Sequence, residues 1–281
     1  MKIHVLSDLH NEFLEWTPRP EALAAADVVV LAGDIHTGAS GVGWAARHLR
    51  GKPTVYVAGN HEFYRGHWDK TLEDIRGEAA KAGIEFLEDD RVVLDGVRFL
   101  GCSLWTDFQY FGSGAAQQLA MNDYVAGLMD CRAINAGRVR GDGGYEAERL
   151  TPLHVLQRHN RSRAWLESAL DEPFEGPTVV VTHHLPHRNS VAPRFANDRL
   201  TPGFAVDLPN QTIAKADLWI HGHTHDSCAY AVRDPNAVRE CTVICNPMGY
   251  PLSTGAMENK RFDPHLLVQV GDGVHLLRGN A

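Results

Sequence analysis

Carboxylate, imidazole and amide side chains gather in five short clusters along this chain of 281 residues. The clusters are Asp8-Leu9-His10, Gly33-Asp34, Gly59-Asn60-His61-Glu62, Thr182-His183-His184 and Gly222-His223-Thr224-His225. Together they offer the ligands that borderline divalent metals such as Mn, Fe, Co, Ni and Zn accept in proteins. In the Asp-x-His and His-x-His clusters, a one-residue spacer on extended backbone directs both side chains to the same side. The clusters therefore predict a metal site.

Each cluster directly follows a short apolar run of strand length. The runs and their clusters occupy residues 2–10, 27–34, 54–62, 178–184 and 217–225. Near-continuous apolar runs are typical of strands covered on both faces. Helix-like stretches at about 18–26 and 41–50 separate the first three runs, which predicts parallel strands joined by helices. Because ligand sites in such sheets form outside the carboxyl ends of the strands, all five clusters fall where a site is expected.

The remaining sequence predicts a second sheet and more helices within a single domain spanning 1–281. Apolar residues recur at helical spacing over about 66–82 and 152–170, and residues 91–106 and 228–247 alternate like antiparallel strands. Two last short strands are expected at 266–270 and 274–277. The glycine-rich region 108–150 lacks a clear period, so we expect a variable loop or lid there.

The ordered set DxH, GD, GNHE, THH and GHTH resembles the calcineurin-like metallophosphoesterase family, and the likeness extends from residue 3 to about residue 250. This resemblance implies an α/β fold, a four-layer α/β/β/α sandwich of two mixed β-sheets flanked by helices. It also implies two divalent metal ions, for which manganese is favoured while Fe, Zn, Co and Ni fit the same ligands.

The resemblance further implies a role for each site residue. Asp8, His10 and His225 would bind the first metal, Asn60, His183 and His223 the second, and Asp34 both. A hydroxide bridging the two metals would attack the phosphorus atom. His61 would stay uncoordinated, face the substrate, and protonate the leaving group or stabilise charge.

Several neighbours of these residues allow more than one reading. His184, His187 and His221 are candidates for a substrate pocket, although His184 should point away from His183 on an extended backbone. Glu62 could orient His61, or it could cap a loop or lie at the surface. The aromatic residues Phe63, Tyr64, Trp105 and Phe108 could line an apolar leaving-group pocket or belong to the core.

Composition excludes several classes of protein. A formal net charge of −8 provides no basic surface for duplex DNA. The five cysteines contain no Cys-x-x-Cys pair, which indicates reduced thiols rather than a disulfide framework or a zinc ribbon. No apolar run has the length of a signal-peptide core or a membrane span. We therefore expect a cytoplasmic enzyme with no membrane partner.

The favoured activity is hydrolysis of small-molecule phosphodiesters, with phosphomonoesters as an alternative. Diesters are preferred because GNHE and GHTH resemble family phosphodiesterases, and because the GDxxDRG-type segment of the protein phosphatases is absent after Asp34. A single-strand nuclease of the same family remains an alternative, as does a non-catalytic interaction scaffold. A scaffold that has lost its metals should lack ligands, and here none is missing.

Overall fold

A computed structural model describes residues 1–138, 140–141, 144–237 and 239–277. Twelve strands form two six-stranded sheets, and each sheet is mixed. The first sheet has the order β12-β11-β1-β2-β3-β4, with parallel pairing from β1 to β4 and antiparallel pairing of β11 with β1 and β12. Its strands are β1 (Lys2–Leu6), β2 (Val28–Ala32), β3 (Thr54–Val57), β4 (Glu85–Phe86), β11 (Leu267–Gly271) and β12 (Gly273–Leu277).

The second sheet has the order β5-β6-β7-β8-β10-β9 and is parallel from β6 to β10. Antiparallel partners close both of its edges. Its strands are β5 (Asp90–Leu94), β6 (Val97–Cys102), β7 (Thr178–Thr182), β8 (Leu218–His221), β9 (Cys228–Arg233) and β10 (Glu240–Cys245). The two-sheet α/β architecture expected from the sequence is confirmed.

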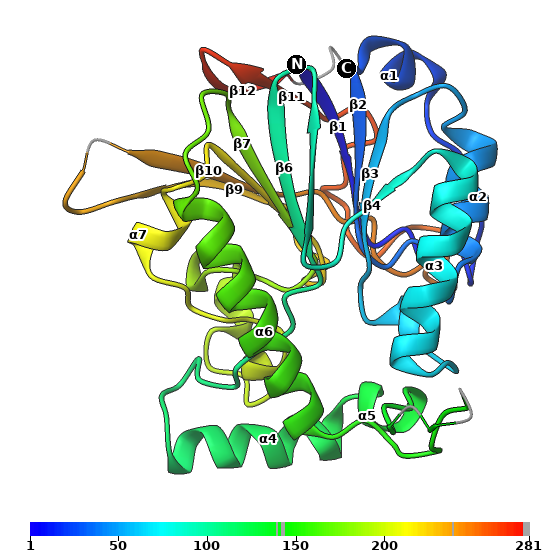
Figure 1. Cartoon of the computed structure of the whole chain (residues 1–281), viewed down its shortest axis with the longest axis vertical. Coiled ribbons are helices and arrows are strands. Elements are labelled where there is room, and N and C mark those ends of the chain that lie inside the picture. Colours follow the sequence, from blue (N-terminus) through cyan, green and yellow to red (C-terminus); the bar gives the residue numbers. More distant parts are fainter. Residues whose placement is uncertain (139, 142–143, 238, 278–281) are drawn as a thin grey trace.

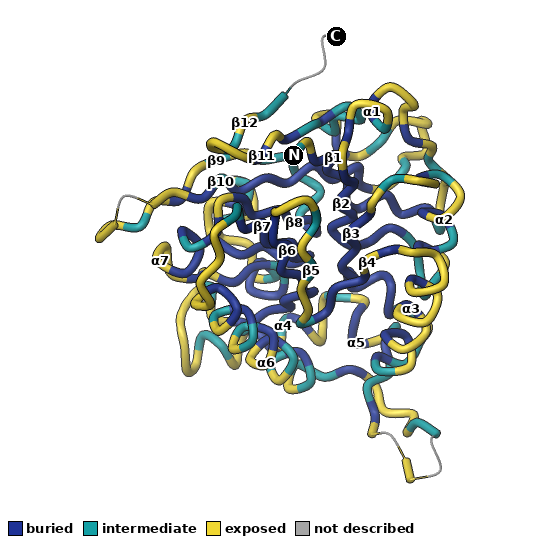
Figure 2. Tube along the Cα trace, turned by 45° about the horizontal axis from the view of Figure 1, so that its top comes forward, coloured by how far each residue is buried: buried dark blue, intermediate teal, exposed yellow. Residues whose placement is uncertain are grey.

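Helices cover the outer face of each sheet. Figure 1 shows α2 (Ser40–His48) and α3 (Trp68–Ala82) beside the first sheet, and α6 (Pro152–Asp171) beside the second. Two shorter helices, α1 (Pro20–Ala25) and α7 (Asn210–Ile213), complete these layers. Figure 2 shows buried strands at the centre and exposed residues mainly on the surrounding helices and loops. All of the expected helix spans before residue 108 and after residue 150 correspond to helices, with ends that differ by a few residues.

Successive side chains of a central strand point to opposite faces of its sheet, and this alternation holds the layers together. In β2, Val28 and Val30 belong to the apolar cluster between the sheets, which also contains Phe99 and Val181 of the second sheet. The intervening residues of β2 join a second cluster with residues of α2 and α3. Because both faces of the central strands are buried, their sequences are continuously apolar.

The region 108–150, where a variable loop or lid is expected, contains α4 (Ala115–Gly127) and α5 (Asp130–Ala133). Met121 and Tyr124 of α4 are buried, whereas Leu119 is 61% exposed and Val125 is 47% exposed. Apolar residues therefore occur on both the covered and the open side of this helix, which removes the periodic signal. Residues 139 and 142–143 of this region lie outside the described residues.

All five cysteines are unpaired thiols, and Cys228 is the one that is not fully buried. Within the described parts of the chain, no helix is both long enough and apolar enough to cross a membrane.

Candidate metal centre

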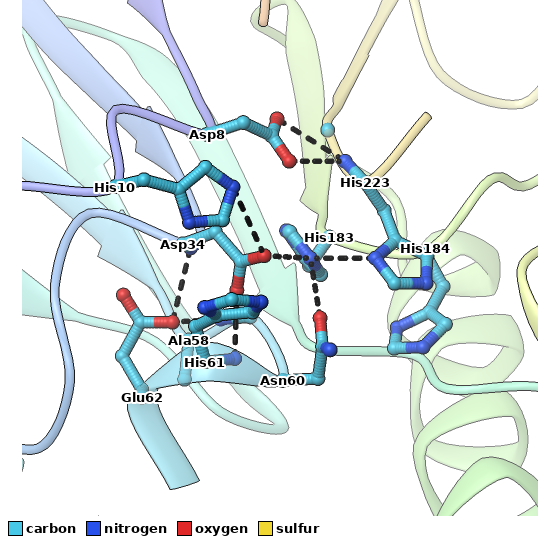
Figure 3. A network of polar contacts seen from close by, with 12 residues as sticks. Asp8, His10, Asp34, Ala58, Asn60, His61, Glu62, His183, His184 and His223 are labelled. Carbon is cyan, nitrogen blue, oxygen red and sulfur yellow. Dashed lines mark hydrogen bonds and ion pairs between the residues drawn. The ribbon is translucent and has the colours of Figure 1, made fainter. Parts of the chain in front are cut away.

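The predicted ligand side chains meet at the carboxyl edge of the two sheets. Three groups of them have potential ligand atoms within 4.8 Å of one another. These groups are Asp8, His10 and His225; Asp34, His183 and His223; and His10, Asp34 and His61. Figure 3 shows Asp34 between His10 on one side and His183 on the other. A carboxylate in this position can belong to two neighbouring metal sites.

In the first group, the atoms that face one another are hydrogen-bond acceptors. Nδ1 of His10 lies 3.2 Å from a Glu12 carboxylate oxygen, and Nδ1 of His225 lies 2.7 Å from a Glu258 carboxylate oxygen. Because a carboxylate only accepts, both Nδ1 atoms donate, and each neutral ring keeps a lone pair on Nε2. These two Nε2 atoms lie 3.0 Å apart, and Asp8 Oδ1 is 3.4 Å from that of His225. These three acceptor atoms repel one another when the site is empty, and all three could coordinate a cation bound among them.

The second group has the same character. His183 Nδ1 donates to the Ala32 carbonyl oxygen at 2.9 Å, so in the neutral ring the lone pair lies on Nε2, which faces the site. Around that Nε2 lie Asn60 Oδ1 at 3.2 Å and Asp34 Oδ2 at 3.4 Å. The amide nitrogen of Asn60 donates to Asp130 at 2.9 Å, which turns its oxygen toward His183. The residues present therefore fit a second divalent ion, held in place by outer hydrogen bonds.

The protonation tendencies of these groups follow from their burial and charge. Burial lowers the pKa of His183, but the neighbouring Asp34 raises it more, to about 9. Burial likewise lowers the pKa of His225, while Asp8 and Glu258 raise it to about 10. Without a bound cation, both rings would therefore take a second proton on Nε2 near neutral pH, and a cation coordinated by Nε2 would replace that proton.

The backbone at the site is strained rather than extended. Asp8, His10, Asp34, His223 and His225 have φ angles between 46° and 70°. The expectation that the one-residue spacers work on extended backbone is therefore wrong. Left-handed conformations cost roughly 1–3 kcal/mol each for such residues and concentrate at functional sites.

Glycine at the strand ends permits this crowding. A Cβ atom on Gly59 would lie 2.1 Å from Asp34 Oδ1, and one on Gly222 would lie 2.6 Å from Asp8 Oδ2. Any side chain at these positions would displace a carboxylate of the site.

Glu62 joins two of the loops that carry the site. Its buried carboxylate accepts hydrogen bonds from the backbone N–H groups of Asp34, Ile35 and Gly59 at 3.0, 2.8 and 2.7 Å. The Tyr56 hydroxyl also donates to it at 2.7 Å. Burial and the nearby Asp34 raise the pKa of Glu62 to about 7. Of the roles left open by the sequence, the structure supports loop capping.

His61 lies at the edge of the metal groups. Its Nδ1 donates to Glu12 at 2.8 Å, and its Nε2 lies 3.0 Å from the Tyr250 hydroxyl. Burial lowers the pKa of His61, but Asp34 and Glu12 outweigh that effect, so the pKa is raised overall. This ring can therefore hold a proton on both nitrogens, Nδ1 beside Glu12 and Nε2 beside the Tyr250 hydroxyl.

A cavity of about 380 Å³ opens beside the metal groups. Asp34, Asn60, His61, His223 and His225 form one end of it, and mostly apolar residues form the other. Tyr64 also lines the cavity, whereas Phe63, Trp105 and Phe108 are fully buried in the core. Of the four aromatic residues considered in the sequence, one therefore lines the cavity and three belong to the core.

The remaining three candidate histidines are buried but do not line this cavity. His184 Nδ1 bonds to the Ser103 carbonyl oxygen at 3.2 Å, and its ring lies 4.3 Å from that of His223. His221 bonds to Ser190 Oγ at 2.8 Å, and His187 bonds to Asn210 Oδ1 at 3.2 Å. Each one has a ring nitrogen bonded to a neighbouring protein group, while Nε2 of His184 is buried without a hydrogen-bond partner.

Four further residues of the site were missed in the sequence: Glu12, Asp130, Tyr250 and Glu258. Glu12 offers a weak signal, since it continues the alternation Asp8-x-His10-x-Glu12. Asp130 lies in the region without a period, and the other two follow the last cluster. Their partners are distant in sequence, so no local pattern could have identified them.

The chain is similar to known proteins in sequence and in fold. The family model described as calcineurin-like phosphoesterase matches residues 1–227. A solved phosphopantetheinyl hydrolase from Mycobacterium tuberculosis superposes with a TM-score of 0.65 at 16% identity, covering 89% of this chain and 90% of that one. TT1561 of Thermus thermophilus gives a TM-score of 0.43 at 13% identity, with 88% of each chain covered. No curated protein matches by sequence.

Proposed function

Because this chain belongs to the calcineurin-like phosphoesterase family, we propose that it is a dinuclear metal-dependent enzyme that hydrolyses small-molecule phosphodiesters. The observation that supports this most directly is that acceptor atoms face one another in two groups on either side of Asp34, whose Oδ2 lies 3.8 Å from His10 Nε2 and 3.4 Å from His183 Nε2. Within each group the acceptor atoms lie 3.0 to 3.4 Å apart. Two such sets of lone pairs provide the ligands that two neighbouring cations require.

We assign Asp8, His10 and His225 to one ion, Asn60, His183 and His223 to the other, and Asp34 to both. When bound, two such ions lower the pKa of a water molecule and offset the charge of a phosphoryl group. The ligand set fits manganese, and it also suits Fe, Zn, Co and Ni, so metal identity must be measured.

His61 also forms a possible ligand group with His10 and Asp34. We place it outside the coordination shell because both of its ring nitrogens have other partners within 3.0 Å, Glu12 and Tyr250. With Glu12 holding Nδ1–H, the proton on Nε2 lies beside the Tyr250 hydroxyl, and both residues line the cavity. That proton can be donated to the leaving oxygen of an ester.

The charges around the cavity favour a diester over a monoester. Among the lining residues, all of which the structure describes, Arg194 is the one Lys or Arg side chain. Its guanidinium already donates to both oxygens of Asp226, at 3.0 and 2.5 Å. No Lys or Arg side chain of the lining is therefore left over for the second negative charge of a phosphomonoester, because the proton of His61 is assigned to the leaving oxygen.

The test is a substrate panel with the metal content measured in parallel. The full-length protein is stripped with a chelator, reloaded with Mn²⁺ or another single metal, and assayed with bis(p-nitrophenyl) phosphate, p-nitrophenyl phosphate, cyclic nucleotides and a single-stranded oligonucleotide. We expect two metal equivalents and the highest kcat/KM for the aryl diester. The matched variants Asp34→Asn and Asp95→Asn separate loss of the site from a general effect.

Two results would overturn the proposal. A higher kcat/KM for the oligonucleotide than for any small diester would indicate the nuclease alternative. A protein that binds two metals but hydrolyses none of these esters would indicate a non-catalytic scaffold.

A further inference from the structure

The cavity beside the metal groups has an apolar wall, which we define as Leu128, Leu185, Val191, Leu200 and Phe204. The wall comes from two segments that are far apart in sequence. Leu128 lies between α4 and α5, whereas the other four follow β7. Met129 and Phe195 extend the wall toward solvent, where they are 54% and 39% exposed.

The apolar wall starts in direct contact with the metal groups. The ring of Phe204 stacks on the ring of His223, with centroids 4.5 Å apart and planes 26° from parallel. His223 is one of the proposed ligands. A phosphoryl group held at the metals would therefore place one of its ester substituents against the wall.

Backbone hydrogen bonds hold the wall in shape. The Leu185 N–H donates to the Phe204 carbonyl oxygen at 3.2 Å, and the Val206 N–H donates to the Leu185 carbonyl oxygen at 3.0 Å. On the other side, α4 packs so closely that a Cβ atom on Gly127 would lie 2.6 Å from a Leu200 methyl carbon. The wall is thus a preformed surface rather than a chance cluster of side chains.

The polar side chains that line the cavity from the segment after β7 already have protein partners. The Thr201 hydroxyl donates to the Phe195 carbonyl oxygen at 2.6 Å, Arg194 is paired with Asp226, and one oxygen of Asp198 accepts from the Leu200 N–H at 2.8 Å. The leucine, valine and phenylalanine side chains of the wall offer no hydrogen bond to a sugar or a nucleobase, whose polar groups would lose water there at a cost in free energy. An alkyl or aryl group would instead gain from leaving water.

From this arrangement, and resting on the proposed function, we infer that the apolar wall is the subsite for an uncharged alkyl or aryl ester group. The substrates of this site are then monoanionic phosphodiesters with at least one compact apolar substituent. The size of the cavity, about 380 Å³, is near the lower end of the roughly 300–1,000 Å³ of small-molecule sites, which favours a compact group.

The test compares two probes with the same charge and the same phosphodiester centre. Dimethyl phosphate and dibutyl phosphate are used as competitive inhibitors of bis(p-nitrophenyl) phosphate hydrolysis by the metal-loaded protein, and their binding is also measured directly by calorimetry. Since each buried methylene group strengthens binding by about fourfold, we expect dibutyl phosphate to bind at least about tenfold more tightly.

Substitutions in the wall should reduce that ratio. Leu200→Asn and Val191→Asn each place an amide at the proposed subsite, so the ratio of the two binding constants should fall to about threefold or less. Leu119→Asn makes the same leucine change on an exposed part of α4 outside the cavity, and it should keep the ratio of the unaltered protein. Thermal unfolding of all variants shows which of them are folded, and two wall variants guard against the failure of one.

The outcomes separate this inference from the proposed function. Hydrolysis of the aryl diester together with equal binding of the two probes would overturn the apolar subsite and leave the phosphodiesterase proposal standing. Tighter binding of dibutyl phosphate in calorimetry without any hydrolysis would support the subsite and contradict the proposed reaction. An unchanged ratio in folded Leu200→Asn and Val191→Asn variants would also overturn the subsite.

Discussion

The carboxylate of Glu12 accepts a hydrogen bond from Nδ1 of His61 at 2.8 Å. The same oxygen lies 3.2 Å from Nδ1 of His10. One side chain therefore orients a proposed metal ligand and the proposed proton donor together. Burial raises the pKa of Glu12, but its bonds to the two histidines lower the pKa by a larger amount, to about 2. Glu12 therefore stays ionised across the neutral range.

Replacing Glu12 should weaken both functions of this pair. In Glu12→Gln the amide no longer provides a full negative charge to the two rings, so metal affinity should fall by about 10–100-fold, as for other outer-shell partners. Metal titration of the stripped protein measures this change. Glu15→Gln, an exposed glutamate paired with Arg47 and His48, is the matched control and should keep the original affinity. Equal affinities in the two variants would contradict the role of Glu12.

Removing the His61 ring should affect the reaction more than the metals. We expect His61→Ala to retain two metal equivalents while kcat falls by about 10²–10⁴-fold, because a positioned proton donor is lost. His48→Ala removes a histidine that pairs with Glu15 away from the site and should leave kcat unchanged. Loss of one metal equivalent in His61→Ala would instead show that His61 is a ligand.

Gly59 should not tolerate even a methyl group. Its added Cβ would lie 2.1 Å from Asp34 Oδ1 and 2.7 Å from His183 Cε1, so Gly59→Ala should abolish binding of at least one metal. The same change at Gly77 has open space in the interior of α3. Since alanine favours helices, Gly77→Ala should keep both metals and gain up to about 1 kcal/mol in the free energy of unfolding. Elemental analysis and urea denaturation measure the two effects.

Glu88 should make the free energy of unfolding depend on pH. Burial and the nearby Asp89 raise its pKa from 4.5 to about 7, while its carboxylate accepts hydrogen bonds from Ser103. Between these values the folded chain keeps a proton that the unfolded chain has lost, so the free energy of unfolding falls as pH rises. A shift of this size corresponds to at most about 3 kcal/mol.

Glu88→Gln should remove this loss. The gain in the free energy of unfolding that the substitution produces should be larger at pH 7.5 than at pH 4.5, by up to about 3 kcal/mol. Urea denaturation of the variant and the unaltered protein at both pH values measures this difference. Glu85→Gln changes an exposed glutamate and should show no such pH-dependent gain. A pH-independent difference for Glu88→Gln would contradict the raised pKa.

The layers of the fold could be predicted from local pattern because strands buried on both faces must be continuously apolar. The run Val28 to Ala32 illustrates this: its odd and even residues pack into two different clusters. The helix α4 could not be predicted in this way, because Leu119 and Val125 remain exposed and obscure its buried side. Its packing against residues 200–203, which builds the cavity, has no local signal.

By itself the sequence determined which residues come together in the candidate metal groups, since parallel strands carry their terminal residues to one edge whatever the details of packing. Only the tertiary structure decided which atom of each residue faces the site. His10, His183 and His225 present Nε2 because Glu12, the Ala32 carbonyl and Glu258 engage their Nδ1 atoms. His184, His187 and His221 are equally close in sequence to ligands or site loops, but they bond to other protein groups. The physical reason is that a hydrogen-bond partner distant in the chain fixes a ring, and spacing along the chain does not encode it.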